Sequence, residues 1–173
     1  MQIDFHHAVT YVVARLAKFD HKEANIIACS SQYVDDAVNY GEIKFGDGSL
    51  YYHISSAHKM IDLRNSDSLP DHEVWIPFHF LPGNDPDQGG FLKKIICREN
   101  SAVAQDMVKD CILEKNKPYG LHRLGVTMHV YADTWAHQGF SGVINAVNTA
   151  KNVASDYRGD ASLKRKLTGL IVS

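Results

Sequence analysis

The stretch LHRLGVTMHVYADTWAHQG carries three side chains of the types that bind metal ions. His129, Asp133 and His137 follow one another at intervals of four residues. At 100° per residue, a helix places them within an arc of about 80°. Imidazole combined with carboxylate suits zinc, or iron or manganese if more carboxylates join. The spacing therefore predicts a metal-binding face on one helix.

The length of this face limits how ions can use it. At 1.5 Å per residue, His129 and His137 lie about 12 Å apart along the helix axis, too far to share one ion. Neighbouring members are one turn apart, so each can share an ion with Asp133. Asp133 is therefore placed to bridge two ions. The interpretation without metal is a partly solvated polar face with hydrogen-bonded histidines.

Further ligands must come from other elements, because one helix cannot fill a coordination sphere. The segment FHHAVTYVVARLAK predicts a helix over 5–18. Helical phase places His6 within its apolar arc and turns His7 about 100° further round, towards solvent. The apolar positions of this helix are Phe5, Val9, Val12, Val13 and Leu16.

A second helix is predicted over 21–38, with Asp20 as N-cap and Glu23 completing a capping box. On this helix Asp35, and not Asp36, shares the apolar face. The other members of that face are Ala24, Ile27, Ala28, Ser31 and Val34. We therefore expect His6 and Asp35 to be metal ligands, with an ordinary acidic helix end as the alternative for Asp35.

Other histidines have weaker cases. His58 precedes Asp62 by four residues, which repeats the spacing of the main face, although a surface pair would look the same. His79 lies in the apolar segment WIPFHFLPG, which predicts burial as a ligand, an acid–base group or a satisfied core residue. His53 and His72 have no comparable context.

The remaining pattern predicts a mainly α, multi-helix bundle with a small β-hairpin insertion near 42–54. Strands at 42–45 and 50–54 flank the turn Gly46-Asp47-Gly48. Residues 64–90 hold most of the prolines and are expected to be loop-rich. Tyr119-Gly120 is expected to form a turn. Further helices are expected at 55–63, 101–115, 121–138 and 142–157.

Composition bounds the class of protein. The chain has 173 residues, 45% of them hydrophobic, which fits a single helical domain over 1–173. Net charge is −2 with Lys and Arg scattered, so no nucleic-acid-binding surface is expected. Neither a transmembrane run nor a signal peptide is evident, which predicts a cytoplasmic protein. The apolar ending LTGLIVS fits the N-terminal part of a longer chain. Three cysteines without a C-x-x-C pattern indicate reduced thiols in or near the core.

The order of these residues resembles the zinc-dependent phospholipase C / P1 nuclease superfamily: a histidine near the N-terminus, an aspartate, a histidine, H-x3-D and a further histidine. Those proteins are mostly α-helical hydrolases that cleave phosphate esters with a cluster of three zinc ions. Four segments are more closely similar to a bacterial family of uncharacterised proteins, a domain of unknown function. They are DFHHAVTYVVARLA, SSQYVDDA, SSAHKM and HVYADTWAHQGFSG.

The resemblance implies a distribution of ligands over the ions. A first zinc would be held by Asp35, His58, His129 and Asp133. His6 and the bridging Asp133 would hold a second, and His137 would begin a third site.

Three departures from the superfamily pattern bear on the number of ions. The gap after Asp133 is shorter than usual, no H-x3-E follows His137, and no processed N-terminal Trp precedes His6. One or two divalent ions, zinc first among them, are therefore expected rather than three.

The function expected from these residues is hydrolysis of a phosphate ester, with a small molecule or a lipid as substrate. Two ions would lower the pKa of a water and neutralise phosphoryl charge, and Asp35 would orient the attacking water. Two alternatives stay open. One is a non-enzymatic metal-binding or structural protein whose site is closed by protein ligands. The other is a metal-free helical interaction protein with packed histidines.

Overall fold

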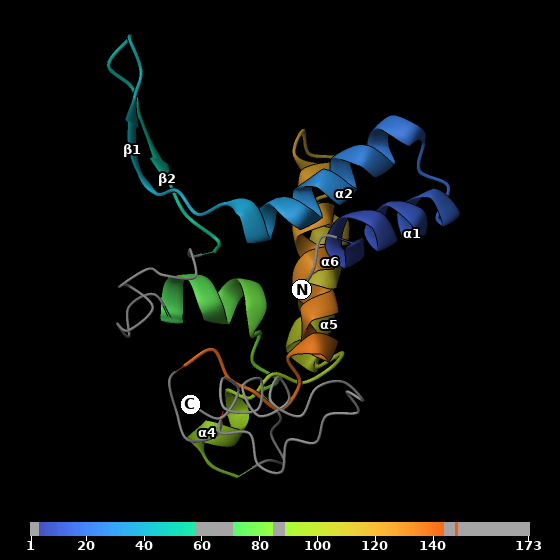
Figure 1. Cartoon of the computed structure of the whole chain (residues 1–173), viewed down its shortest axis with the longest axis vertical. Helices are drawn as coiled ribbons and strands as arrows, with labels where there is room; N and C mark the ends of the chain where they lie inside the picture. Colours follow the sequence, from blue (N-terminus) through green and yellow to red (C-terminus); the bar gives the residue numbers. More distant parts are fainter. Residues whose placement is uncertain (1–3, 58–70, 85–88, 144–147, 149–173) are drawn as a thin grey trace, which may run out of the picture.

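The computed structural model of the chain describes residues 4–57, 71–84, 89–143 and 148. Within these ranges the protein is mainly helical, with one small antiparallel sheet of two strands (Figure 1). This confirms the predicted mainly α class and the hairpin. None of the described helices is both long enough and apolar enough to cross a membrane.

The N-terminal third is a pair of helices joined by a short turn. A π-helical turn, η1 (Asp4–Val9), continues into α1 (Thr10–Leu16), and α2 (His21–Asp36) follows. Lys18 adopts a positive φ of 76° in the turn. The predicted capping box is present: Glu23 N donates to Asp20 Oδ1, and Asp20 N donates to Glu23 Oε2, both at 2.9 Å. It satisfies two backbone donors that the start of α2 would otherwise leave unpaired.

The buried side of η1 and α1 differs from the predicted apolar face. The buried residues are His6, Thr10 and Ala14. The residues expected inside are all exposed: Phe5, Val9, Val12, Val13 and Leu16. The buried face is rotated towards His6, because small side chains there let the helix lie close against α2. His6 is therefore buried as expected, but not because it shares an arc with large apolar residues.

Helix α6 (Gly120–Ala136) packs against α2, against α5 (Ala102–Leu113) and against η3 (Asp71–His79). The contact with α2 is especially close at Gly125. A Cβ built there would lie 2.3 Å from the Ile27 carbonyl oxygen and 2.6 Å from Ser30 Cβ. Glycine is therefore required at this crossing, as expected from its small size. The predicted inward face of α2 is confirmed, since Ala24, Ile27, Ala28, Ser31 and Val34 are all buried.

The segment before α5 contains a helix that the sequence did not predict. Residues 64–90 were expected to be loop-rich, but η3 spans Asp71–His79. Its Pro77 cannot donate a backbone hydrogen bond, which is why the sequence of this segment is typical of a helix break. The wider turn continues to Phe80, whose N–H donates to the Trp75 carbonyl at 2.8 Å. A short helix, α4 (Phe91–Lys94), follows.

Four smaller expectations have different outcomes. Residues 55–57 are not helical, and the rest of the helix expected at 55–63 lies outside the described residues. The turn expected at Tyr119-Gly120 is confirmed, because Gly120 N donates to the Lys117 carbonyl at 2.8 Å, and Gly120 is also the first residue of α6. Most of the helix expected at 142–157 lies outside the described residues, and positions 142 and 143 are not helical. The three cysteines are unbonded, with Cys97 and Cys111 buried but Cys29 exposed.

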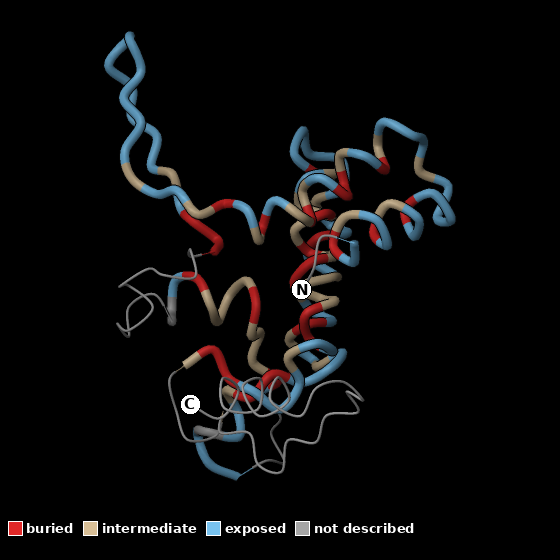
Figure 2. Tube along the Cα trace, viewed as in Figure 1, coloured by how far each residue is buried: buried red, intermediate tan, exposed pale blue. Residues whose placement is uncertain are grey.

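The hairpin projects from the helical body (Figures 1 and 2). Strand β1 (Gly41–Lys44) pairs with β2 (Leu50–His53) in the register Ile43 opposite Tyr51. Gly48, with φ 85°, and Asp47, whose Oδ1 accepts from Ser49 N at 2.9 Å, form the turn. The predicted turn is confirmed.

Gly125→Ala tests the close crossing of α2 and α6. The added Cβ would force the helices apart, and overpacking of this kind costs about 1–3 kcal/mol. Alanine's better helix propensity returns only about 1 kcal/mol. We expect a net loss in the free energy of unfolding, measured by urea denaturation. Gly46→Ala is the matched control, because nothing lies within 4 Å of a Cβ there. An equally stable Gly125→Ala protein would contradict the packing argument.

Candidate metal centre

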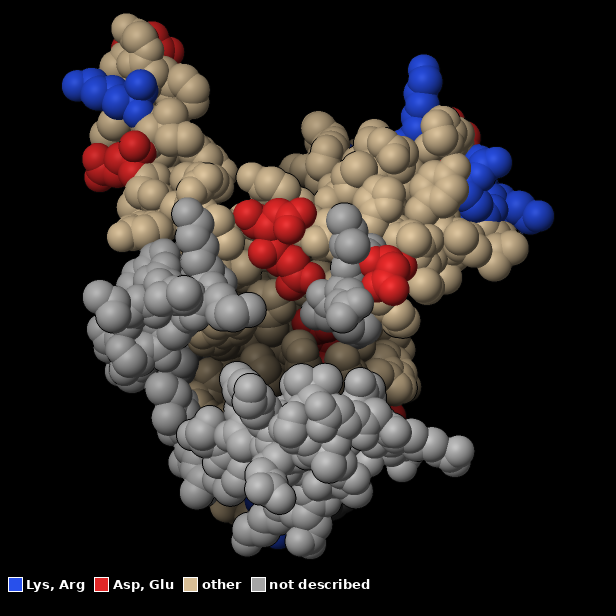
Figure 3. Space-filling model, in the orientation of Figure 1, with Lys and Arg blue, Asp and Glu red and all other residues tan. Residues whose placement is uncertain are grey.

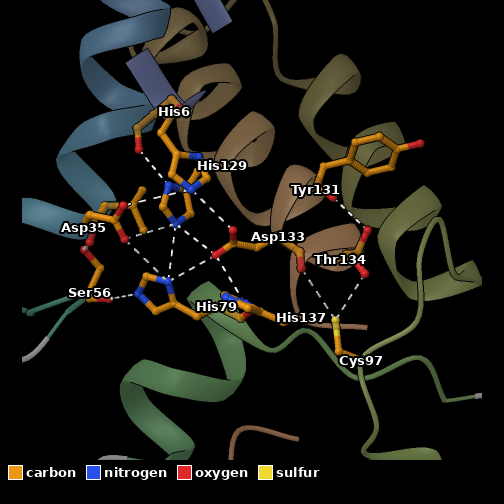
Figure 4. Close-up of polar contacts among 12 residues, drawn as sticks. His6, Asp35, Ser56, His79, Cys97, His129, Tyr131, Asp133, Thr134 and His137 are labelled. Carbon is orange, nitrogen blue, oxygen red and sulfur yellow. Dashed lines mark hydrogen bonds and ion pairs between the residues drawn. The ribbon is translucent and has the colours of Figure 1, made fainter. Parts of the chain in front are cut away.

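Histidine and aspartate side chains from four elements meet below the crossing of α2 and α6 (Figure 4). His6 comes from η1, Asp35 from the last turn of α2, and His79 from the end of η3. The other members are from α6 and the residue that ends it: His129, Asp133 and His137. Five of the six predicted site residues are therefore brought together, joined by His79.

Asp133 is the centre of the cluster and is completely buried. Its Oδ1 lies 3.3 Å from His6 Nε2. Its Oδ2 lies 3.3 Å from His79 Nδ1 and 3.4 Å from His129 Nε2. The two carboxylate oxygens thus face different imidazoles.

Asp35 repeats this division at slightly longer range. Its Oδ2 lies 3.9 Å from His6 Nε2, and its Oδ1 lies 3.8 Å from both His79 Nδ1 and His129 Nε2. Within the part of the chain that the structure describes, two groups of three ligand atoms are close enough to hold an ion. One contains His6, His129 and Asp133, and the other contains Asp35, His79 and His129.

Backbone carbonyls fix which nitrogens of two histidines face inward. His129 Nδ1 lies 2.9 Å from the Ser31 carbonyl oxygen, and His79 Nε2 lies 2.8 Å from the Ser56 carbonyl oxygen. A carbonyl only accepts, so each of these nitrogens carries a proton and donates it outward. In the neutral rings, the inner nitrogens then present lone pairs. These inner atoms, His129 Nε2 and His79 Nδ1, are 3.4 Å apart.

The charge states of the buried groups follow from their surroundings. Burial lowers the pKa of His129, so its ring is neutral at pH 7. Burial by itself would raise the pKa of Asp133, but the imidazoles of His129, His6 and His79 close to its oxygens outweigh this and hold the pKa well below its ordinary value. Asp133 is therefore a carboxylate. An inner surface of lone pairs and negative charge is unstable by itself, and a bound cation removes the conflict.

Polar atoms without hydrogen bonds also point to a ligand. Three buried atoms have no hydrogen-bond partner among the described residues: both ring nitrogens of His6, and Asp133 Oδ1. Such atoms are rare in folded proteins unless an ion or water satisfies them. The donor set of imidazole and carboxylate fits a divalent ion of the zinc, iron or manganese type.

Cys97 lies near the cluster but is not suited to be a ligand. Its Sγ contacts the carbonyl oxygens of Asp133 and Thr134, at 4.0 and 3.7 Å. Burial, followed by the negative charge of Asp133, raises the pKa of the thiol to about 12. The thiol is directed at the backbone of the end of α6, and Cys97 belongs to neither group of ligand atoms among the described residues.

His137 lies at the edge of the cluster. Its Nδ1 donates to the His79 carbonyl oxygen at 2.6 Å, and its ring stacks on Phe80 with centroids 4.5 Å apart. Nδ1 is also 3.6 Å from Asp133 Oδ2. His137 belongs to neither group of three ligand atoms. Its spacing from His129 predicted this separation, and its bond to His79 gives it a positioning role.

The phase arguments for the other elements are confirmed in part. Asp36 is exposed and accepts from Gln32 Nε2, so Asp35 is the inward member of the pair. His7 is half-buried and contacts Cys29 rather than the cluster. His58 and Asp62 lie outside the described residues, so the prediction for His58 stays open. His79 was the ligand that spacing did not select. Its apolar neighbours were the only sequence signal.

A pocket of about 400 Å³ opens beside the cluster. Asp35, His79 and His137 line it on the side of the cluster, and Trp75 and Phe80 add aromatic walls. On the face shown in Figure 3, Asp and Glu gather near the middle without Lys or Arg among them, whereas the hairpin and the far end of α1 and α2 carry charges of both signs. The cluster is thus reachable, and its surroundings favour a cation.

A family model described as "Family of unknown function (DUF6765)" matches residues 1–171. The chain belongs to this family. No curated protein and no solved structure matches the chain. Membership in DUF6765 confirms the predicted similarity to a domain of unknown function. The more distant resemblance to the phospholipase C / P1 nuclease superfamily stays a prediction.

Substitution of His79 tests the cluster in this DUF6765 protein directly. His79→Ala removes one inner nitrogen, and we expect metal content, measured by elemental analysis after purification without added metal, to fall strongly. His53→Ala is the matched control, because His53 stacks on Tyr51 in the hairpin. The metal content of His58→Ala tests whether His58, the ligand that the resemblance implies, also binds the ion. Metal content unaffected by His79→Ala would contradict the assignment.

Proposed function

We propose that this protein is a metal-dependent hydrolase of phosphate esters, with one or two zinc-like ions held by the histidine–aspartate cluster. The observation that supports the proposal best is the pair of inward-facing ring nitrogens of His129 and His79 beside the carboxylate of Asp133. The pocket against Asp35, His79 and His137 supplies the access that an enzyme requires.

The division of oxygens favours two ions over one. Asp133 and Asp35 each turn one oxygen towards His6 and the other towards His79 and His129. An ion on the His6 side and an ion on the other side would therefore share both carboxylates as bridges. Paired ions bridged in this way are a common arrangement in hydrolases of phosphate esters.

The chain's own residues have separate roles in this proposal. Bound divalent ions would lower the pKa of a water and neutralise charge on a phosphoryl oxygen. Asp35, whose side chain is 23% exposed, is the carboxylate of the cluster that reaches the pocket, and it would orient the attacking water. The Ser31 and Ser56 carbonyls hold the rings of His129 and His79 in place. Trp75 and Phe80 would contact the rest of the substrate.

The resemblance to the phospholipase C / P1 nuclease superfamily supports the choice of phosphate esters, and His79 would take the place expected for His58. The bundle fold of that superfamily belongs to the same proposal. A lipid or a small molecule carrying the ester are both consistent with the pocket.

A second candidate is a non-enzymatic metal-binding protein. The complete burial of His6, His129 and Asp133 favours it, because structural ions are enclosed by protein ligands. X-ray absorption spectroscopy of the metal-loaded protein separates the two. A coordination sphere filled by His and Asp alone supports the structural role, and a sphere that includes water supports the hydrolase.

Activity measurements test the proposal itself. The metal-loaded protein should hydrolyse a model phosphodiester or phosphomonoester, and chelation should abolish the reaction. Asp133→Ala should lose metal and activity together, because one oxygen of Asp133 faces His6 and the other faces His79 and His129.

Asp35→Asn should weaken metal binding less than Asp133→Ala, because the amide oxygen can still be a ligand, and at saturating metal it should lower kcat by about a hundredfold or more, as expected for a residue that positions a reacting water. Asp36→Asn is the matched control, since Asp36 is exposed and points away. Absence of turnover on both substrate types, with metal content unchanged in Asp133→Ala, would refute the proposal.

A further inference from the structure

The outer edge of β1 has backbone groups whose direction can be deduced. Phe45 N donates to the Ser49 carbonyl oxygen at 2.9 Å, so Phe45 faces β2. Residues of an antiparallel strand alternate between the two edges, and the register continues this bond, with Ile43 opposite Tyr51. Ile43 therefore also faces β2. Glu42 and Lys44 direct their N–H and C=O groups to the opposite edge.

This edge is self-complementary in charge. If a second β1 pairs antiparallel with Ile43 opposite Ile43, then Glu42 of each copy lies opposite Lys44 of the other. The alternation agrees with this register, because Glu42 and Lys44 are the residues whose backbone groups face outward. Two ion pairs and a ring of backbone hydrogen bonds would form about one two-fold axis. The outer edge of β2 carries Leu50 and Tyr52 and has no such charge match.

The hairpin also exposes more apolar surface than an isolated hairpin can usually support. Ile43 is 45% and Tyr51 54% exposed, and they share one face of the sheet. Phe45, Leu50 and Tyr52 are exposed as well. A sheet of two strands by itself is only marginally stable in water, whereas a sheet of four strands with a shared apolar face can be stable. A pair of hairpins would bring Ile43 and Tyr51 of both copies into one continuous strip.

We propose that β1 is a dimer interface, at which a second copy of this chain pairs edge to edge and forms a four-stranded antiparallel sheet. The hairpin projects from the helices, so the metal cluster need not move when this contact forms (Figure 1). The inference is independent of the proposed hydrolase activity.

A charge-reversal cycle tests the pairing. Sedimentation equilibrium of the full chain should show a monomer–dimer equilibrium. Lys44→Glu and Glu42→Lys each place like charges opposite one another twice, and each should weaken the dimer by about tenfold or more. The double variant E42K/K44E restores opposite charges and should recover the dimer. Lys93→Glu is the control, because Lys93 is exposed on α4. A wild-type monomer, or a dimer indifferent to both single reversals, overturns the proposal.

Cross-linking tests the register. In the proposed pairing the two Ile43 residues form a non-hydrogen-bonded pair, with Cα atoms about 4.5 Å apart, within the range that a disulfide spans. In a Cys29→Ser background, Ile43→Cys should give a covalent dimer under mild oxidation, detected by non-reducing electrophoresis. Leu50→Cys, on the other strand, should not. Equal cross-linking of the two variants, or none with Ile43→Cys, overturns the proposed register.

Discussion

The close crossing of α2 and α6 is the constraint on which the described structure depends. Gly125 lets the backbone of α2 approach until a Cβ would collide with the Ile27 carbonyl. One turn further along α6, this approach brings the Ser31 carbonyl to His129, and after a second turn it brings Asp35 close to Asp133. The ligand geometry is thus a consequence of helix packing, since a larger residue at 125 would separate both pairs.

The electrostatics of the cluster favour a bound cation in the folded state. Four elements supply lone pairs and carboxylates to one buried volume, with the tautomers of His79 and His129 fixed by backbone carbonyls. An ion that binds only the folded chain stabilises it, because such a site does not exist in the unfolded chain. Ions at the two groups of ligand atoms would together join η1, α2, η3 and α6. Metal binding and stability would therefore be coupled at Asp133, which contacts every imidazole of the group.

Local rules predicted the helical elements well where caps and phase were clear. The capping box at Asp20 and the inward face of α2 followed from residue types and 3.6-residue periodicity. These rules failed at η1 and η3, where the chain forms π-helical turns, which are wider than those of an α-helix. Pro77 has the pattern of a break, yet η3 continues through it. On η1 and α1 the large apolar residues were expected inside, but close packing against α2 selected the face with His6, Thr10 and Ala14.

By itself, the sequence determined that His129 and Asp133 share a face, that Asp35 rather than Asp36 turns inward, and that His137 stands apart, because these depend only on spacing along a helix. Only the tertiary structure decided that His79 joins them, since it comes from a different element 50 residues away. It also decided which ring nitrogens carry protons, because the Ser31 and Ser56 carbonyls belong to neighbouring segments. The predicted metal face on one helix thus became a cluster enclosed by four elements. Periodicity describes one element at a time, and a metal centre requires several to meet.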